Sequence, residues 1–176
     1  MKPLALYIHW PFCLAKCPYC DFNSHVNARI DETRMVDALI SEMSYWHGRV
    51  DIRPLTSIFF GGGTPSLLAP ANVARLLNEA QKLFGFAPHI EITLEANPTS
   101  SEAEKFKSFA AAGINRLSIG VQSLHDASLK SLGREHNVAE AIKAIGIAQS
   151  IFPRHSFDLI YARKGQTTQQ WEAELN

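Results

Sequence analysis

The stretch IEITLE at residues 90–95 places apolar side chains at every second position and charged or hydroxyl side chains between them. The stretch RLSIGVQ at residues 116–122 has the same alternation. A period of two is typical of a β-strand with one apolar face. A parallel sheet covered by helices on both faces would need apolar side chains on both of them. The two stretches therefore predict an α/β fold in which the apolar face meets helices and the polar face lines a lumen.

Outward from these strands, apolar runs alternate with helical patterns along the chain. We expect further strands at residues 4–9, 56–60 and 156–161, with the run of glycines at 61–63 ending the second of them. The first two expected helices cover residues 31–46 and 73–84. Four more helices are expected to begin at Ser100 or Ser101, at Asp126, after the cap residue Asn137, and near Thr168. Alternating strands and helices predict parallel βα units. About five units give an incomplete (β/α) barrel, a partial TIM barrel, in a single domain over residues 1–176.

The composition restricts the classes of partner. The chain of 176 residues contains 17 Lys and Arg and 17 Asp and Glu, so no long-range field attracts nucleic acid or an anionic membrane. The apolar residues 4–12 are too few to span a bilayer and are not followed by a cleavage site for export. We therefore expect that nucleic acid is not a binding partner and that the protein associates with a membrane only through a partner. We expect it in the cytoplasm, where thiols stay reduced.

The cysteines of the chain, Cys13, Cys17 and Cys20, have the spacing C-x3-C-x2-C. Three thiolates on one loop can bind three corners of a cubane iron–sulfur cluster, which leaves one iron without a protein ligand. An open metal position is typical of a reactive site. A zinc site completed by His9 or His25 is the alternative, and a disulfide is disfavoured because three cysteines leave one over. The spacing favours the cluster.

Other unusual residues come where strands are expected to end, which is the edge that carries the active site of a βα barrel. Glycines 61–63 with Thr64 follow the second strand, and they could let the backbone approach a ligand closely. Glu95 ends the third strand and could pair with an ammonium group. Gln122 ends the fourth strand.

Two charged residues allow two readings each. Arg134 could bind a carboxylate through both its terminal nitrogens, or it could be a surface arginine paired with Glu135 or Asp126. Asp158 lies in an apolar run, where an unpaired charge is costly, so it needs a partner. That partner is either a ligand hydroxyl or Arg116.

Several motifs together resemble one family. YIHWPFC at 7–13, GGGTPS at 61–66, EANP at 95–98, GVQS at 120–123 and DLIY at 158–161 are similar to the radical S-adenosylmethionine proteins related to oxygen-independent coproporphyrinogen III oxidase. The resemblance implies a [4Fe–4S] cluster on Cys13, Cys17 and Cys20, with S-adenosylmethionine on its open iron as the source of a 5′-deoxyadenosyl radical. It also implies cofactor contacts at Tyr7, Tyr19, Gly62, Gly63, Thr64, Glu95, Gln122, Arg134 and Asp158.

The residues after the third cysteine distinguish two branches of this family. DFNS at 21–24 resembles the heme chaperones that deliver heme to respiratory proteins, whereas the porphyrinogen-decarboxylating enzymes have a further cysteine there. The resemblance therefore implies heme or porphyrin as a ligand and a heme-accepting respiratory protein as a partner. A coproporphyrinogen oxidase-like redox enzyme, or an inactive fragment of either protein, is the alternative, so enzymatic activity stays undecided.

The chain departs from the family pattern in two places. Residues 162–167 read ARKGQT where the family has GLPGQT, which removes a glycine and a proline beside the expected cofactor site. The chain ends at Asn176 after five expected strands, whereas the family has six units followed by a C-terminal domain. We therefore expect a radical S-adenosylmethionine core truncated before the sixth strand, with an exposed final strand that is prone to aggregation.

Overall fold

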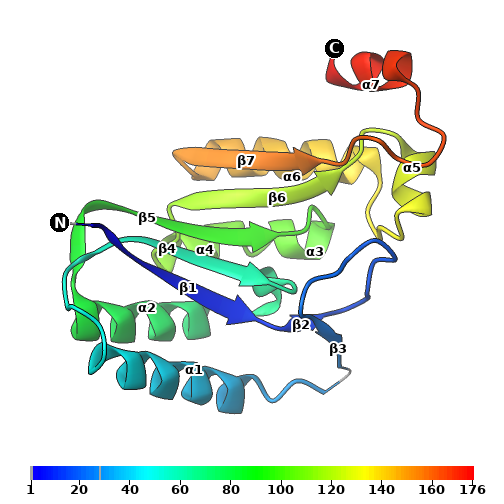
Figure 1. The fold of residues 1–176 in the computed structure, drawn as a ribbon. Coiled ribbons are helices and arrows are strands. Elements are labelled where there is room, and N and C mark those ends of the chain that lie inside the picture. The colour runs from blue at the N-terminus through cyan, green and yellow to red at the C-terminus, as the bar shows by residue number, and fades with distance from the viewer. Residues whose placement is uncertain (1, 28) are drawn as a thin grey trace.

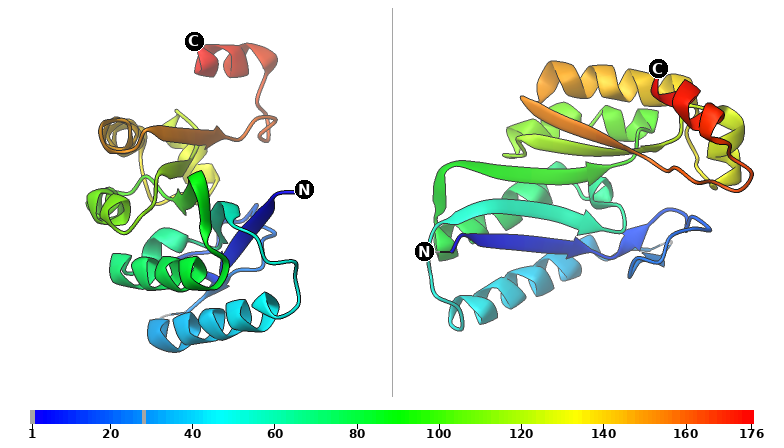
Figure 2. Two further views of the ribbon diagram at one scale, coloured as in Figure 1. Left: turned by 90° about the vertical axis from the view of Figure 1, so that its left-hand side faces the viewer. Right: turned by 45° about the horizontal axis from the view of Figure 1, so that its top comes forward.

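The computed structural model describes residues 2–27 and 29–176 and contains one five-stranded parallel sheet. Its strands in spatial order are β1 (Leu4–Trp10), β4 (Leu55–Gly62), β5 (Phe86–Ala96), β6 (Arg116–Gln122) and β7 (Arg154–Leu159). The spatial order follows the chain order, so every crossover advances in one direction and the longer helices that connect the strands collect on one face of the sheet (Figures 1 and 2). This is the predicted open barrel, and the fold class is confirmed.

The helices and short elements connect these strands. They are β2 (Phe12–Cys13), β3 (His25–Val26), α1 (Glu32–His47), the 3-10 turn η1 (Pro65–Leu67), α2 (Pro70–Phe84), α3 (Ser100–Ala103), α4 (Phe106–Ala111), α5 (Asp126–Ser131), α6 (Val138–Ile151) and α7 (Thr168–Leu175). The predicted cap at Asn137 is confirmed, because its side chain accepts from the Glu140 amide while the Glu140 carboxylate accepts from the Asn137 amide. No helix in the described ranges is long and apolar enough to cross a membrane.

Several predicted boundaries differ from the structure, among them that of the strand expected at residues 156–161, which is β7 at Arg154–Leu159. Gly61 and Gly62 do not end the second strand; they continue β4 and pair with His9 and Trp10 of β1. A Cβ at Gly62 would lie 2.7 Å from the His9 ring and 2.9 Å from the Trp10 carbonyl oxygen, so only glycine lets the two strands remain adjacent here. The helix expected from Ser100 or Ser101 is divided into α3 and α4, and its cap position is Thr99, whose side chain makes no capping bond.

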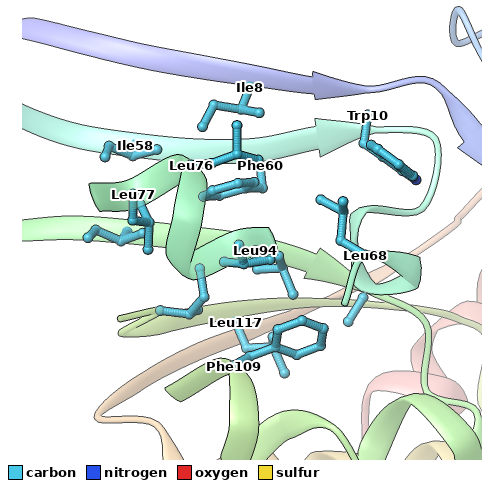
Figure 3. Close-up of a cluster of buried hydrophobic side chains, with 14 of the residues drawn as sticks. Ile8, Trp10, Ile58, Phe60, Leu68, Leu76, Leu77, Leu94, Phe109 and Leu117 are labelled. Atoms are coloured by element: carbon cyan, nitrogen blue, oxygen red, sulfur yellow. The ribbon is translucent and has the colours of Figure 1, made fainter. Parts of the chain in front are cut away.

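The apolar faces of the central strands form the core with the helices. Phe60 of β4, Leu94 of β5 and Leu117 of β6 are fully buried and extend toward Leu76 of α2 and Phe109 of α4 (Figure 3). On β5 and β6, the alternate positions carry the polar side chains predicted to line a lumen. The core therefore holds the sheet from one side and leaves the carboxyl ends of the strands free to form a site.

Candidate functional site

A cavity of about 380 Å³ lies at the carboxyl ends of the strands, as the barrel predicts. It brings together residues from all three regions singled out in the sequence: the cysteine loop, the strand ends and the segment after α5. The predicted site residues that line it are Cys13, Cys17, Tyr19, Cys20, Gly63, Thr64, Glu95, Gln122, Arg134 and Asp158. Tyr7 and Gly62 do not line it.

The cysteine loop is closed at its base. β2 and β3 pair in parallel at its two ends, and the His25 amide donates to the Pro11 carbonyl oxygen at 2.7 Å. The Lys16 ammonium group donates to the Ser24 carbonyl oxygen at 3.3 Å, and His9 Nε2 donates to the Asn23 carbonyl oxygen at 2.9 Å. The three thiols form no disulfide. These contacts hold the loop over the strand ends and leave its sulfur atoms available.

The glycine motif packs against this loop. The amide of Gly63 donates to the Trp10 carbonyl oxygen at 2.6 Å, and the amide of Thr64 donates to the Phe12 carbonyl oxygen at 2.9 Å. A Cβ at Gly63 would lie 2.6 Å from the Phe12 carbonyl oxygen and 3.0 Å from Cys13 Sγ. The motif is therefore required first for the close approach of β4 to the cysteine loop. Its contact with a ligand remains a prediction.

Arg134 points into the cavity. Its guanidinium donates to Asn97 Oδ1 at 2.5 Å and to the Gly120 carbonyl oxygen at 2.9 Å, and it reaches Cys17 Sγ at 3.6 Å. The alternative of a surface arginine paired with Glu135 or Asp126 is wrong, because the side chain turns toward the cysteine loop. Asp126 instead accepts from the amide of residue 138.

Tyr19 lies beside Arg134, with its hydroxyl 3.5 Å from the guanidinium. Burial raises the pKa of Tyr19 to about 12, with Cys17 acting in the same direction and Arg134 opposing both. The Tyr19 hydroxyl is therefore a neutral hydrogen-bonding group at the edge of the cavity.

Two carboxylates line the cavity on the strand ends. Burial raises the pKa of Glu95, the Gly62 amide opposes this shift, and the nearby charge of Asp158 adds to it. The expectation that Asp158 needs a partner is wrong: its side chain is exposed, because it lies on the polar face of the edge strand β7. Arg116 donates instead to Thr93 Oγ1 and Ser156 Oγ. In the described part of the chain, neither carboxylate forms an ion pair.

The two remaining predicted residues support the strand ends from outside the cavity. Tyr7 is 56% exposed, its ring stacks on Phe59, and its hydroxyl lies 3.4 Å from His9 Nδ1. Gly62 has φ of 112°, which favours glycine, and its amide faces Glu95. Direct contact of either residue with a cofactor remains a prediction.

The three thiols of the cysteine loop are the ligand type that a cubane cluster takes. Among residues 2–27 and 29–176, no three His, Cys, Asp or Glu side chains converge on one metal position. A cubane needs no such convergence, because each thiolate binds a different iron. His9, one candidate zinc ligand, is already engaged with Asn23 and Tyr7. The three cysteines on one cavity wall therefore fit a [4Fe–4S] cluster.

The cavity also has unmet hydrogen-bonding capacity. Buried polar atoms without a partner in the described residues include Ser24 Oγ, Arg134 Nε and His136 Nδ1, and all three residues line the cavity. Buried polar atoms are normally hydrogen-bonded, so these atoms indicate room for a polar ligand or bound water.

The predicted site residues did not include Asn97, Ser118 and His136, which also line the cavity. Asn97 follows Glu95 by two residues at the end of β5, so the rule that placed Glu95 in the site could also have found it. Ser118 shares the polar face of β6 with Gln122. His136 is buried, and its ring nitrogen Nε2 donates to the Val121 carbonyl oxygen at 3.1 Å, a contact with no sequence signal.

Comparison with known proteins gives similarities consistent with this site. The chain is 44% identical to the heme chaperone HemW of Haemophilus influenzae over 97% of this chain and 46% of that protein. It is 41% identical to the mitochondrial radical S-adenosyl methionine domain-containing protein 1 of Bos taurus, over 97% of this chain and 39% of that protein. The chain thus spans less than half the length of these relatives.

Solved structures agree with the fold. Coproporphyrinogen III oxidase of Escherichia coli, a radical SAM enzyme, superposes with a TM-score of 0.88 at 31% identity, over 99% of this chain and 41% of that one. The methyltransferase TsrM of Kitasatospora setae superposes with a TM-score of 0.61 at 13% identity, over 98% of this chain and 33% of that one, which supports the fold alone. The family model described as the radical SAM superfamily matches residues 7–176, and the chain therefore belongs to that superfamily.

Proposed function

We propose that the chain binds a [4Fe–4S] cluster through Cys13, Cys17 and Cys20 and binds S-adenosylmethionine in the adjoining cavity. The observation that carries this proposal is the charge arrangement around the cysteines. Arg134 lies beside the cysteine loop, while Glu95 and Asp158 lie on the strand ends of the same cavity. S-adenosylmethionine carries one carboxylate and two cationic groups, so its charges complement this lining.

The protein residues would supply binding and orientation. Both Nη2 hydrogens of Arg134 are used by Asn97 and Gly120, so Nη1, which is directed at the cysteine loop, would be its charged donor to a carboxylate. A cation placed near Glu95 and Asp158 would relieve their mutual repulsion and favour the ionised form of Glu95, whose pKa is otherwise raised. Tyr19 and Thr64 offer hydroxyls that stay neutral. When bound, the cluster would supply the one-electron chemistry, which is a property of the cofactor and not of these side chains.

The experiment that tests this proposal is anaerobic reconstitution with iron and sulfide. We expect about four irons per chain, the stoichiometry of a cubane cluster. After reduction, an electron paramagnetic resonance signal should change when S-adenosylmethionine is added. Uptake of zinc but not iron, or a spectrum unaffected by S-adenosylmethionine, would contradict the proposal.

We further propose that the site belongs to a heme chaperone, acting in the reducing cytoplasm on behalf of a heme-accepting respiratory protein. The likeness to the heme chaperone of Haemophilus influenzae supports this function, and so does residue 21, where the chain has Asp in the DFNS segment. The likeness to coproporphyrinogen III oxidase supports the second candidate, an oxidoreductase that acts on a porphyrinogen.

Heme titration separates the two candidates. A heme chaperone should develop a Soret band and retain heme through gel filtration. A porphyrinogen oxidase should instead consume coproporphyrinogen anaerobically, given S-adenosylmethionine and a reductant. Because the relatives are more than twice as long, both measurements should include the chain joined to the remaining part of a relative.

A further inference from the structure

Glu102 is a buried carboxylate that the proposed site does not use. It lies on α3, is 3% exposed and does not line the cavity. One carboxylate oxygen accepts from the Ser66 hydroxyl and from the Asn97 backbone amide at 2.8 Å, and the other accepts from Asn97 Nδ2 at 3.3 Å. A buried carboxylate is costly unless hydrogen bonds satisfy it. Here two of the three donors come from Asn97, so the carboxylate is committed to that residue.

The carboxylate decides which way the Asn97 amide faces. Both carboxylate oxygens of Glu102 accept hydrogen bonds, and the one nearest the Asn97 side chain faces the amide nitrogen at 3.3 Å and not the amide oxygen. Thr64 Oγ1 lies 3.5 Å from the same nitrogen. The amide oxygen of Asn97 is therefore directed to the other side, where it accepts from Arg134 Nη2 at 2.5 Å.

This orientation holds Arg134 at the cysteine loop. The guanidinium is fixed by the Asn97 oxygen and the Gly120 carbonyl oxygen, and its other terminal nitrogen then lies 3.6 Å from Cys17 Sγ and 3.5 Å from the Tyr19 hydroxyl. If the Asn97 amide were reversed, its NH₂ group would oppose the guanidinium. Two donors facing each other would push Arg134 away from this position.

We propose that Glu102 is a positioning residue that acts through the Asn97 amide to hold the Arg134 guanidinium where it binds the carboxylate of the ligand. The identity of that ligand rests on the proposed function, whereas the effect of Glu102 on Arg134 does not.

The test compares Glu102→Gln with Glu104→Gln, the same chemical change two residues away at an exposed position. In Glu102→Gln, the new amide group can donate toward Asn97 and remove the preference for one orientation. Calorimetric titration of the reconstituted protein should use S-adenosylhomocysteine, which has the carboxylate, and 5′-methylthioadenosine, which lacks it. We expect Glu102→Gln to weaken the binding of S-adenosylhomocysteine about tenfold, which is the equivalent of one charge-assisted hydrogen bond. Its affinity for 5′-methylthioadenosine and both affinities of Glu104→Gln should match the wild type.

If Glu102→Gln weakens the binding of both nucleosides equally, Glu102 has a general structural role and the proposal is overturned. Unchanged affinity for both nucleosides would also overturn it. If Glu102→Gln fails to fold, Glu102→Asp provides a second test, because its shorter side chain withdraws the carboxylate from the Asn97 amide and leaves Asn97 and Arg134 unchanged. If the wild type binds neither nucleoside, the proposed function is refuted but the inference about Glu102 is not. The crystal structure of Glu102→Gln would then decide: Arg134 must have left Asn97 and Cys17, and an unmoved Arg134 overturns the inference.

Discussion

Gly63 is limited by space rather than by backbone conformation. Its φ is not in the left-handed region, yet a Cβ there would meet the Phe12 carbonyl oxygen at 2.6 Å, and backbone cannot move aside as a flexible side chain can. The cysteine loop and β4 therefore approach each other only because residue 63 has no side chain. This makes the position sensitive to the smallest possible substitution.

We expect Gly63→Ala to destabilise the protein by about 1–3 kcal/mol, the usual cost of overpacking, and to lower iron uptake because Cys13 must shift. The matched control is Gly146→Ala in α6, where an added Cβ meets nothing within 4 Å. That control should be neutral or stabilising by up to about 1 kcal/mol, since alanine favours a helix. Urea unfolding and iron analysis measure both effects, and equal behaviour of the two variants would argue against the packing explanation.

At the scale of elements, α7 is attached to the sheet by a buried ion pair. Glu174 accepts from Arg163, from Ser123 Oγ at 2.6 Å and from the Leu124 amide at 2.7 Å, and its side chain is fully buried. Arg163 also donates to the Ile160 carbonyl oxygen at 2.9 Å. The segment that departs from the family pattern thus supplies the link between β7 and α7. Ala162, where the family has glycine, adopts the left-handed conformation with φ of 57°.

The ion pair predicts a pH dependence. Burial alone would raise the pKa of Glu174, but the hydrogen bonds from Arg163, Ser123 and Leu124 outweigh it and lower the pKa from 4.5 to about 2. A carboxyl group with a lowered pKa stabilises the folded state fully above the unfolded value. This stability is lost as the pH falls from about 4.5 toward 2, and it amounts to at most about 3 kcal/mol.

Glu174→Gln should therefore be less stable than the wild type at pH 7 and should lose less stability between pH 5 and 3. Glu172→Gln, an exposed change in the same helix, should follow the wild-type curve. Urea unfolding across this range provides the measurement. If the free energies of unfolding of the wild type and Glu174→Gln change in parallel with pH, the pKa of the Glu174 carboxyl group is not lowered in the folded state.

At the scale of the whole molecule, β7 is an edge strand of the sheet, because among the described residues it pairs with β6 alone (Figure 1). Phe157 on this strand is 45% exposed, and Tyr161 just beyond it is 70% exposed. An unpaired strand that carries exposed aromatic residues is a template for pairing with another chain. Association through the edge of β7 therefore remains a prediction.

We expect the protein to associate with itself as its concentration rises and Phe157→Lys to reduce this association, because charged side chains at an edge discourage pairing. Tyr45→Lys is the matched control: Tyr45 is 50% exposed but lies on α1, away from the edge. Light scattering after gel filtration measures the mass of each variant. A monomer at all concentrations, or equal effects of the two substitutions, would rule out β7 as the contact surface.

The sequence by itself determined the strands, their order and the end of the sheet that carries the site. Side-chain alternation in β5 and β6 depends only on the two-residue period of a strand, and the spacing of Cys13, Cys17 and Cys20 is local to one loop. Glu95, Gln122 and the glycine motif were found because parallel strands all end at the same edge.

Only the tertiary structure decided which polar residues face one another. Glu102 resembles a surface residue of a short helix, but Ser66, 36 residues earlier, accounts for its burial. Arg163 resembles a solvated arginine, but it pairs with Glu174, which also contacts Ser123 from 51 residues away. Local patterns specify local backbone geometry, whereas the cost of burying a charge is met by donors whose proximity depends on the packing of the entire barrel.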